Sequence, residues 1–410
     1  MHIVSSKTIC CLVRRGRRSR RPNLSGYHWY KGVITWSVAL AEYWHWFGVF
    51  EDACKCLEVP MRHFDYSFLE HGMLPAGLVN TVSAIAALRE RENERKDTWI
   101  DIFSRLENIA KVQSVKGSNA IEGIVTSEQR LVAIVNQNSL PVNHNEAEIA
   151  GYRDALSIVH TDYKTLDICE RDMLRLHKIM LSYGTAEGGQ YKETDNLIME
   201  IDTSGARRVR FSPTPARETP ETMEQLVLAY LDARNNYSIN QLLLIPCFIL
   251  DFLCIHPFTD GNGRMSRLLS LLLLYKNGFT AGKYISFEDQ INKQKVLYYE
   301  ALRKSSEGWS EGVNSYFPFI SNFITILLYC YKELDKRFAS IRSTKVSKRQ
   351  RVEETVLNSL LPISKKEICY VLLDISPTTV EAVLAGMVKN GQVKKIGSGR
   401  GTKYVKKDRV

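Results

Sequence analysis

One stretch of twelve residues, 256–267, constrains this chain more than any other part of it. It reads His-Pro-Phe-Thr-Asp-Gly-Asn-Gly-Arg-Met-Ser-Arg, and an apolar run to Tyr275 follows directly. Gly261 and Gly263 lack Cβ atoms, so the backbone around Asn262 can curl into a concave row of N–H groups that binds anions. The apolar run is typical of a buried helix, whose first-turn N–H groups and positive dipole end would face the same anion. The sequence therefore predicts a phosphate site at this helix start.

The charged residues of the stretch fit the same site. Arg264 and Arg267 are three residues apart, so both lie on the first turn, where planar guanidinium groups can hold further phosphate oxygens. Asp260 precedes the turn, and Mg²⁺ favours a carboxylate combined with substrate oxygens. His256 has an ordinary pKa near neutrality, as a general base needs. Taken singly, each residue fits a plain helix-loop-helix turn with a capping Asp260 and a core histidine, but the full set at this spacing favours chemistry.

The stretch also matches the signature of Fic-domain proteins, which is His-Pro-Phe, any residue, Asp-Gly-Asn-Gly-Arg, two residues and Arg. The chain thus resembles a family whose members mostly transfer AMP from ATP to a hydroxyl side chain of a target protein. The resemblance implies ATP as substrate, Mg²⁺ as cofactor and a target Ser, Thr or Tyr. It makes His256 the base and Asp260 the metal ligand. It places Gly261, Asn262, Gly263 and Arg264 around the α- and β-phosphates and Arg267 on the γ-phosphate.

A second short string, residues 118–123, reads Ser-Asn-Ala-Ile-Glu-Gly. Ser118 and Glu122 are four apart, hence on one face of a helix that Gly123 would end. Alone this is a capped helix end, but it resembles the family's inhibitory motif of Ser or Thr, three residues, Glu, then Gly or Asn. The resemblance implies that Glu122 pairs with Arg267 in the place of the γ-phosphate. A carboxylate can compete with phosphate for the same guanidinium.

A hairpin is expected between the helices that precede the motif. Residues 196–201 and 208–211 alternate as strands around a turn at 202–205, and three prolines close the segment. A short exposed hairpin beside a nucleotide site can hold an extended peptide by strand addition, and the resemblance makes it the target-docking flap. The expected edge residues are Leu197, Ile198 and Met199. A plain surface hairpin is the alternative.

Four further positions carry weaker signals. Tyr298 and Tyr299 can pack against an adenine ring, and the resemblance places similar residues near the base, although two tyrosines on a helix also fit a core. His177 is expected to be structural, because nothing around it in the sequence supplies a partner. Lys192 stands where related sequences often have Arg.

Most of the remaining chain has helical periodicity, which predicts a mainly α fold. We expect a Fic-type helical domain with a β-hairpin flap over residues 61–340, including its inhibitory segment, and a basic linker over 341–351. Residues 352–410 predict a small winged-helix (α+β) domain. The expected helices outside that domain are 74–121, 146–159, 169–182, 223–235, 246–255, 265–275, 284–302 and 317–338.

The winged-helix prediction depends on capping and turn residues. Ser364 and Glu367 form a capping box, and Ser376-Pro377 opens a third helix to Lys389. A strand at 393–396, a wing at 397–401 and a returning strand at 402–405 complete the pattern. Contact with DNA phosphates and docking of a protein both stay open as its role. The basic side chains on or near the third helix and wing are Lys389, Lys394, Lys395, Arg400 and Lys403.

The first sixty residues differ from the rest. A basic cluster at 14–21 precedes an apolar run at 33–50 that contains Glu42 and His45. Such a segment can be a signal anchor or a targeting or nucleic-acid arm, but the run is short and contains an acid, so we do not expect membrane insertion. We expect residues 1–60 to have no fold of their own, as when a start codon is placed too far upstream.

Charge and cysteine content bound the class of protein. The chain of 410 residues carries a net charge of +10, with +5 in residues 1–60 and +9 in residues 342–410, so the central body is slightly acidic. Nine cysteines, an odd number at scattered positions, favour reduced thiols and a cytoplasmic protein. Cys54 and Cys56 with nearby histidines fit no standard zinc spacing.

Other functions remain open at this point. A Fic-type enzyme can transfer another group, such as UMP, phosphate or phosphocholine, or can use Glu122 to position water and remove AMP. From a different class, the chain can be a DNA-binding regulator whose core only senses a nucleotide. The intact set of His256, Asp260, Arg264 and Arg267 favours the enzyme. A homodimer also stays open.

Overall fold

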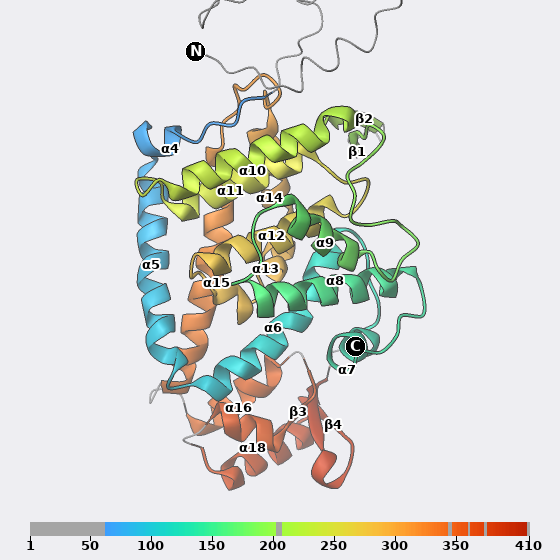
Figure 1. Ribbon diagram of the computed structural model, residues 1–410. Helices are drawn as coiled ribbons and strands as arrows, with labels where there is room; N and C mark the ends of the chain where they lie inside the picture. Colours follow the sequence, from blue (N-terminus) through green and yellow to red (C-terminus); the bar gives the residue numbers. More distant parts are fainter. Residues whose placement is uncertain (1–61, 202–206, 343–346, 360, 373–374, 408–410) are drawn as a thin grey trace, which may run out of the picture. The chain divides into compact units, whose positions relative to one another are not determined.

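The chain is mainly α-helical, as expected (Figure 1). The computed structural model describes residues 62–201, 207–342, 347–359, 361–372 and 375–407. The expectations for residues 1–60 and for the hairpin turn at 202–205 lie outside the described residues. Within the described ranges, no helix is both long and apolar enough to cross a bilayer.

Six helices precede the hairpin in the described part of the chain. Their bounds are α4 (Phe68–His71), α5 (Ala76–Lys96), α6 (Ile100–Ile121), α7 (Glu128–Gln137), α8 (His144–Asp162) and α9 (Glu170–Met180). The periodicity at 74–121 therefore covers two helices, which residues 97–99 separate. Helix α7 was not predicted; its N-cap is Ser127, whose side chain accepts a hydrogen bond from the Arg130 N–H.

Helices after the hairpin include the two that flank the motif. Their bounds are α10 (Thr219–Asn235), α11 (Gln241–Ile255), α12 (Asn262–Lys276), α13 (Phe287–Lys293), α14 (Lys295–Ser306) and α15 (Phe317–Arg342), with short 3₁₀ turns at Ala216–Glu218 and Ala281–Lys283. The single helix expected at 284–302 is wrong in detail. The backbone leaves the helical region at Gln294, which ends α13 and precedes α14.

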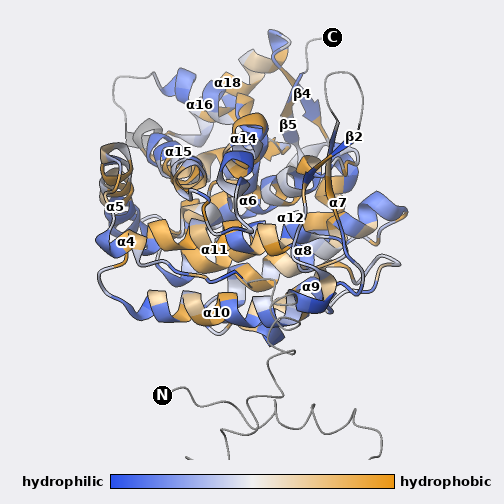
Figure 2. Ribbon diagram, turned by 90° about the horizontal axis from the view of Figure 1, so that it is seen from above, coloured by the Kyte–Doolittle hydropathy of each residue, from blue (hydrophilic) through white to orange (hydrophobic). Residues whose placement is uncertain are grey.

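The hydrophobic core gathers around α11 and α12. Every residue of α11 from Leu242 to Ile255 is buried, and Figure 2 shows this helix in mostly hydrophobic colours. Helix α11 contacts α10, α12 and α15, while α5 packs along α15. Burial of a continuous apolar surface is the main stabilising term. It makes α11 and α12 a firm support for the loop that joins them, residues 256–261.

The expected hairpin is present. Strands β1 (Ile198–Ile201) and β2 (Arg207–Phe211) pair antiparallel, with Met199 opposite Val209 and an irregularity between Ile198 and Met199. These two strands form a sheet by themselves, so the outer edge of each lacks a neighbouring strand in that sheet.

The C-terminal elements have a hydrophobic core of their own, drawn from residues 352–393. Ser364 forms the expected capping box with Glu367, and the strand order is β3-β5-β4. The short strand β3 was not predicted. The bounds are α16 (Lys348–Leu357), β3 (Ile363–Ser364), α17 (Lys365–Val371), α18 (Pro377–Lys389), β4 (Val393–Ile396), η3 (Gly399–Gly401) and β5 (Lys403–Lys406).

Candidate active site

The motif forms a tight loop between α11 and α12. His256 ends α11 in the left-handed conformation, with φ 53°, and its N–H donates to the Phe252 carbonyl at 3.0 Å. The Asn262 side chain accepts from the Phe258 N–H at 2.9 Å and donates to the Phe258 carbonyl at 2.7 Å. Since this amide is used within the loop, the atom that Asn262 can offer to a phosphate is its backbone N–H. Gly261, with φ 81°, is the N-cap of α12.

The loop fixes the protonation state of His256. Its Nδ1 lies 3.3 Å from the Leu253 carbonyl, and because a carbonyl only accepts, Nδ1 carries the proton. Burial lowers the pKa of His256 to about 4. The imidazole is therefore neutral at pH 7, and Nε2 is the nitrogen that can accept a proton from a substrate.

Lys192 and Asn196 brace the backbone on both sides of His256. The Lys192 ammonium donates to the Ile255 carbonyl at 3.1 Å and to Asn196 Oδ1 at 2.9 Å. Asn196 in turn donates to the Phe258 carbonyl at 3.2 Å. Burial lowers the pKa of Lys192 to about 8, and the nearby ammonium contributes to the lowered pKa of His256. The lysine at position 192 thus binds both the Ile255 carbonyl and the Asn196 side chain through its ammonium group.

Asp260 and Arg264 lie at the open side of the helix start. The Asp260 side chain is 61% exposed and its Oδ2 lies 3.2 Å from Arg264 Nη2. Its Oδ1 accepts from the Gly261 N–H at 2.6 Å. The Arg264 side chain is buried and its Nη1 donates to Glu148 of α8. Glu148 therefore holds one side of the guanidinium while the other side faces Asp260. No local sequence pattern indicates this role for Glu148.

Among the described residues, Arg267 donates its side-chain hydrogen bonds to the end of α6. Its Nε donates to Ser118 Oγ at 2.8 Å, and its Nη2 donates to the Ser118 carbonyl at 3.1 Å and to Glu122 Oε1 at 2.7 Å. The Arg267 side chain is 2% exposed and that of Glu122 is 33% exposed. A hydrogen-bonded ion pair shielded from water is strong, and losing one partner leaves a buried charge.

The end of α6 is set by Gly123. Its φ is 80°, and the hydrogen bonds from the Gly123 N–H to the Ala120 carbonyl and from the Ile124 N–H to the Asn119 carbonyl form a Schellman cap. Lys295 of α14 also donates to the Ile121 carbonyl at 2.6 Å. The prediction that Gly123 terminates this helix is confirmed. The termination leaves Glu122 as the last residue before the turn.

The Glu122 carboxylate lies against the first turn of α12. A Cβ atom at Gly263 would overlap with Glu122 Oε1 and would crowd Arg267 Nη1. The carboxylate therefore occupies the space that the missing side chain of Gly263 leaves open. The N-terminal end of a helix attracts negative charge, so Glu122 stands where an anion is stabilised.

A buried carboxylate holds α6 from the other side. Glu288 of α13 is fully buried and accepts from Ser114 Oγ at 2.7 Å and from the Tyr152 hydroxyl at 2.9 Å. Tyr152 also interacts with Ser118. The end of α6 is thus tied to α8 and α13 as well as to Arg267. Sequence reasoning missed this network, because its members are far apart in the chain.

Tyr298 and Tyr299 lie near Arg267, and two of the three expected edge residues of the hairpin are exposed. Tyr298 is buried and interacts with Ser266 and Arg267, and Tyr299 is close enough to Glu122 for their charges to interact. Both rings therefore border the Arg267 side of the site. Leu197 and Met199 are 57% and 47% exposed, while Ile198 is partly buried.

His177 of α9 has two partners, so the expectation that nothing supplies one is wrong. Its Nε2 lies 3.0 Å from the Asp260 carbonyl and its Nδ1 accepts from the Gly189 N–H at 3.0 Å. The ring stacks on Phe258, with centroids 3.7 Å apart and an interplanar angle of 11°. Burial lowers the pKa of His177 to about 4. The sequence concealed this arrangement because Asp260 is 83 residues away.

The site fits a magnesium ion in one respect. Asp260 offers a single exposed carboxylate beside the helix start, and Mg²⁺ in proteins is commonly held by one or two carboxylates together with substrate phosphates. In the described part of the chain, no three His, Cys, Asp or Glu side chains converge as a metal site. The cysteine pair at 54 and 56 lies outside the described residues.

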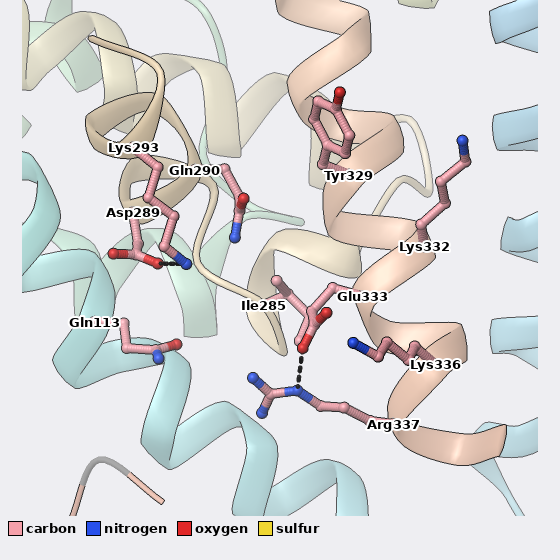
Figure 3. A pocket seen from close by; sticks show the side chains of 10 residues that line it. All are labelled: Gln113, Ile285, Asp289, Gln290, Lys293, Tyr329, Lys332, Glu333, Lys336 and Arg337. Carbon is pink, nitrogen blue, oxygen red and sulfur yellow. Dashed lines mark hydrogen bonds and ion pairs between the residues drawn. The ribbon is translucent and has the colours of Figure 1, made fainter. Parts of the chain in front are cut away.

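A pocket of about 300 Å³ lies elsewhere, between α6, α13 and α15 (Figure 3). Two ion pairs lie in its wall, each between residues of one helix: Lys293 with Asp289 at 2.7 Å, and Arg337 with Glu333 at 3.3 Å. None of the residues that line it belongs to the 256–267 stretch. The pocket therefore has no part in the chemistry of that stretch.

Comparison with known proteins identifies a family that this chain resembles. The model of the Fic/DOC family matches residues 167–274. A protein adenylyltransferase Fic of Nematostella vectensis is 28% identical over 210 residues, which cover 48% of this chain and 44% of that protein. A Fido domain-containing protein of Dictyostelium discoideum is 33% identical over 142 residues, which cover 33% of this chain and 94% of that protein.

The fold is also similar to solved structures. The crystal structure of a Fic family protein from Desulfovibrio desulfuricans G20 has a TM-score of 0.54 and 18% identity, covering 82% of this chain and 98% of that one. At such low identity the similarity concerns the fold alone. The chain spans about half the length of the adenylyltransferases of Nematostella vectensis and Culex quinquefasciatus, 44% and 51%.

Proposed function

Because the chain belongs to the Fic/DOC family, we propose that it is a protein adenylyltransferase, which transfers AMP from ATP to a Ser, Thr or Tyr hydroxyl of a target protein. The observation that carries the proposal is the pairing of a neutral base with an anion site. His256 presents Nε2 at the end of α11, and the first turn of α12 begins within the same loop with Arg264 and Arg267 beside it. Relatives named protein adenylyltransferase support the choice of group.

The proposed reaction is an in-line displacement at the α-phosphorus. Nε2 of His256 takes the proton of the target hydroxyl as its oxygen bonds to the α-phosphorus, and the bond from that phosphorus to the oxygen of the β-phosphate breaks. Pyrophosphate leaves with the electron pair of that bond. The chain's contribution is positioning together with fixed positive potential from the α12 N–H groups and the two arginines. When bound at Asp260, Mg²⁺ would add neutralising charge on the phosphates.

Glu122 is proposed to restrain this reaction. Its carboxylate occupies Arg267 and the anion-binding end of α12, so the γ-phosphate of ATP must compete with it. An ATP that loses this competition can still bind through its base and its other phosphates, but its α-phosphorus is then not aligned with the target hydroxyl. Activation accordingly requires the end of α6 to withdraw from Arg267.

The target is proposed to bind along the hairpin. The exposed side chains of Leu197 and Met199 on β1 and Val209 on β2 support this, since an extended peptide can add to a free strand edge and place alternate side chains on it. The hydroxyl would then be presented to His256.

A cytoplasmic location fits the scattered cysteines, of which the five in the described ranges are free thiols.

Residues 352–410 are proposed to be a winged-helix domain. The order of helix, strand, two helices and two strands supports this. Lys394, Lys395 and Lys403 are exposed on β4 and β5, a distribution that favours contact with nucleic-acid phosphates. Binding of the intact protein to duplex DNA should then weaken steeply as salt rises, and binding that is absent at low salt would leave protein docking as the role.

Label position decides the reaction class. The Glu122→Gly protein is incubated with Mg²⁺ and ATP labelled on either the α- or the γ-phosphate, and covalent label is counted after denaturation. Retention of the α-label alone, abolished by an added His256→Ala, is the expected result. Retention of the γ-label would make the protein a kinase, and retention of neither would indicate another donor, removal of AMP or a purely regulatory core.

A further inference from the structure

His177 joins two loops that the sequence does not bring together. It lies on α9 with an exposed fraction of 2%. One ring nitrogen contacts the Gly189 amide of the loop that follows α9, and the other contacts the Asp260 carbonyl of the motif loop. The reaction proposed above uses neither contact. A buried histidine that links the motif loop to a second loop therefore needs a role of its own.

The partners settle which nitrogen carries the proton. A backbone N–H can only donate, so Nδ1 accepts from Gly189. A carbonyl can only accept, so Nε2–H donates to Asp260. The tautomer is thus opposite to that of His256, in which Nδ1 is protonated. Stacking on Phe258 fixes the plane of the His177 ring.

Close packing brings α9 up to the motif loop. A Cβ atom at Gly261 would lie 2.5 Å from Cε of Met180, the last residue of α9, and 3.5 Å from His177 Nε2. The φ of 81° favours glycine at 261, and a Cβ atom there would also displace the flexible end of the buried Met180 side chain. The contact between His177 and Asp260 thus lies in a closely packed interface.

Holding the Asp260 carbonyl orients the next peptide N–H. The peptide unit from Asp260 to Gly261 is planar and trans, so its carbonyl and N–H point in opposite directions. With the carbonyl turned to His177, the Gly261 N–H points away from α9, where it meets the Asp260 carboxylate at 2.6 Å. One hydrogen bond from His177 thereby directs the Gly261 N–H and, through it, the Asp260 carboxylate.

We propose that His177 is a positioning residue, which holds the Asp260–Gly261 peptide so that its N–H orients the Asp260 carboxylate toward the metal-bound phosphates of ATP. The proposal rests on the proposed function for the identity of the ligand. It assigns His177 to binding of the Mg²⁺–ATP complex and gives it no contact with the reacting atoms.

Two substitutions separate hydrogen bonding from packing. His177→Gln keeps a donor for the Asp260 carbonyl and an acceptor for the Gly189 N–H. His177→Phe keeps a flat ring on Phe258 and removes both hydrogen bonds. His160→Phe is the matched control. His160 is a second buried histidine, which packs in a T-shape on Tyr275 and makes no contact with the motif among the described residues.

Binding is measured in protein that also carries Glu122→Gly and His256→Ala, so that no turnover occurs. Calorimetry gives the affinity for ATP with Mg²⁺ and with chelator. His177→Phe should weaken binding about tenfold in Mg²⁺, the upper end of the scale of one neutral hydrogen bond, and much less in chelator. His177→Gln should remain within about threefold of the parent, and His160→Phe should match it.

Several results would overturn the proposal. Unchanged affinity in a folded His177→Phe protein would do so, as would equal losses with and without Mg²⁺. If His177→Phe does not fold, His177→Gln decides alone, since a large loss of Mg²⁺-dependent affinity in a folded amide variant contradicts the hydrogen-bond argument. Failure of the Glu122→Gly protein to retain AMP would instead refute the proposed function, whatever the affinities show.

Discussion

Arg267 Nη2 lies 2.7 Å from Glu122 Oε1, although 145 positions separate the two residues in the chain. The Arg267 guanidinium also donates hydrogen bonds to Ser118, which lies one helical turn before Glu122. The anion site of α12 is therefore filled by the end of α6. Under the proposed function, the γ-phosphate of ATP must therefore displace the Glu122 carboxylate.

Ser118→Ala should weaken the restraint without abolishing it. The change removes the hydrogen bond from Arg267 Nε to Ser118 Oγ, a bond from a charged donor that contributes about 1.5–3 kcal/mol. Part of that energy stabilises Arg267 against α6, so self-modification with α-labelled ATP should rise several-fold. The increase should stay below that of Glu122→Gly.

The matched control is Ser310→Ala, because the Ser310 hydroxyl bonds only to its exposed neighbour Glu311 among the described contacts. Its rate should equal that of the wild type. A Ser118→Ala rate indistinguishable from this control would show that Ser118 has no share in holding Arg267.

The acid limb of the pH profile should report His256. Its base function needs the neutral imidazole, so activity is present above the pKa and is lost as the pH falls through it. Burial lowers this pKa to about 4, and the Glu122 charge raises it, so the Glu122→Gly change lowers it further. The kcat/KM of the Glu122→Gly protein should accordingly hold through pH 6 and fall only at about 4 or below. Circular dichroism at each pH identifies the range in which the protein stays folded. An acid limb near 6.5 would mean that the catalytic imidazole is solvated.

Lys192→Met should shift the acid limb of the pH profile to higher pH. The Lys192 ammonium disfavours a second positive charge on His256 and so contributes to its low pKa. Removing the ammonium favours the protonated imidazole, which raises the pKa and shifts the loss of activity to higher pH. Lys192→Arg keeps the charge and should leave the limb in place. A limb that stays fixed in Lys192→Met would exclude an electrostatic effect of Lys192 on His256.

A buried carboxylate in α11 should dominate the stability of the helical body. Asp251 is fully buried, accepts from Trp309 Nε1 at 2.7 Å and from the Tyr66 hydroxyl at 2.8 Å, and lies 3.6 Å from Arg62 Nη2. Asp251→Ala leaves these donors unpaired and should lower the free energy of unfolding by about 3–5 kcal/mol.

Denaturant titration measures this loss, and Glu307→Ala serves as the control. Glu307 pairs with Arg303 on the exposed face of α14, where such pairs contribute about 0–1 kcal/mol. Equal small losses in the two variants would show that the Asp251 network is not a stabilising centre.

Local signals in the sequence were sufficient for many elements. The bounds Pro377–Lys389 and Val393–Ile396 agree with the expected helix and strand, because a Ser-Pro start and an Asn-Gly turn act within a few residues. Gly123 ends α6 for the same reason. The motif helix and the antiparallel hairpin also follow from short-range periodicity and turn chemistry.

The parts that could not be predicted depend on contacts across the fold. Glu148 meets Arg264 from a helix 116 residues earlier, and His177 meets Asp260 across 83 residues. Neither has a local pattern that distinguishes it from a core or surface residue. The break at Gln294 also escaped, since helical periodicity continues across it on both sides. Pairings of this kind are set by tertiary packing, which overrides local propensity.

The most direct test of the account compares AMP incorporation by the wild type, Glu122→Gly and Glu122→Gln proteins under the same Mg²⁺ and ATP. Glu128→Gln, an exposed carboxylate on α7 paired with Lys116, controls for the loss of a charge. If the Glu122 carboxylate holds the place of the γ-phosphate on Arg267, Glu122→Gly should be about tenfold faster or more, as the loss of a charge-assisted pair implies. Glu122→Gln should lie between it and the wild type. Equal rates in all four proteins would contradict the account.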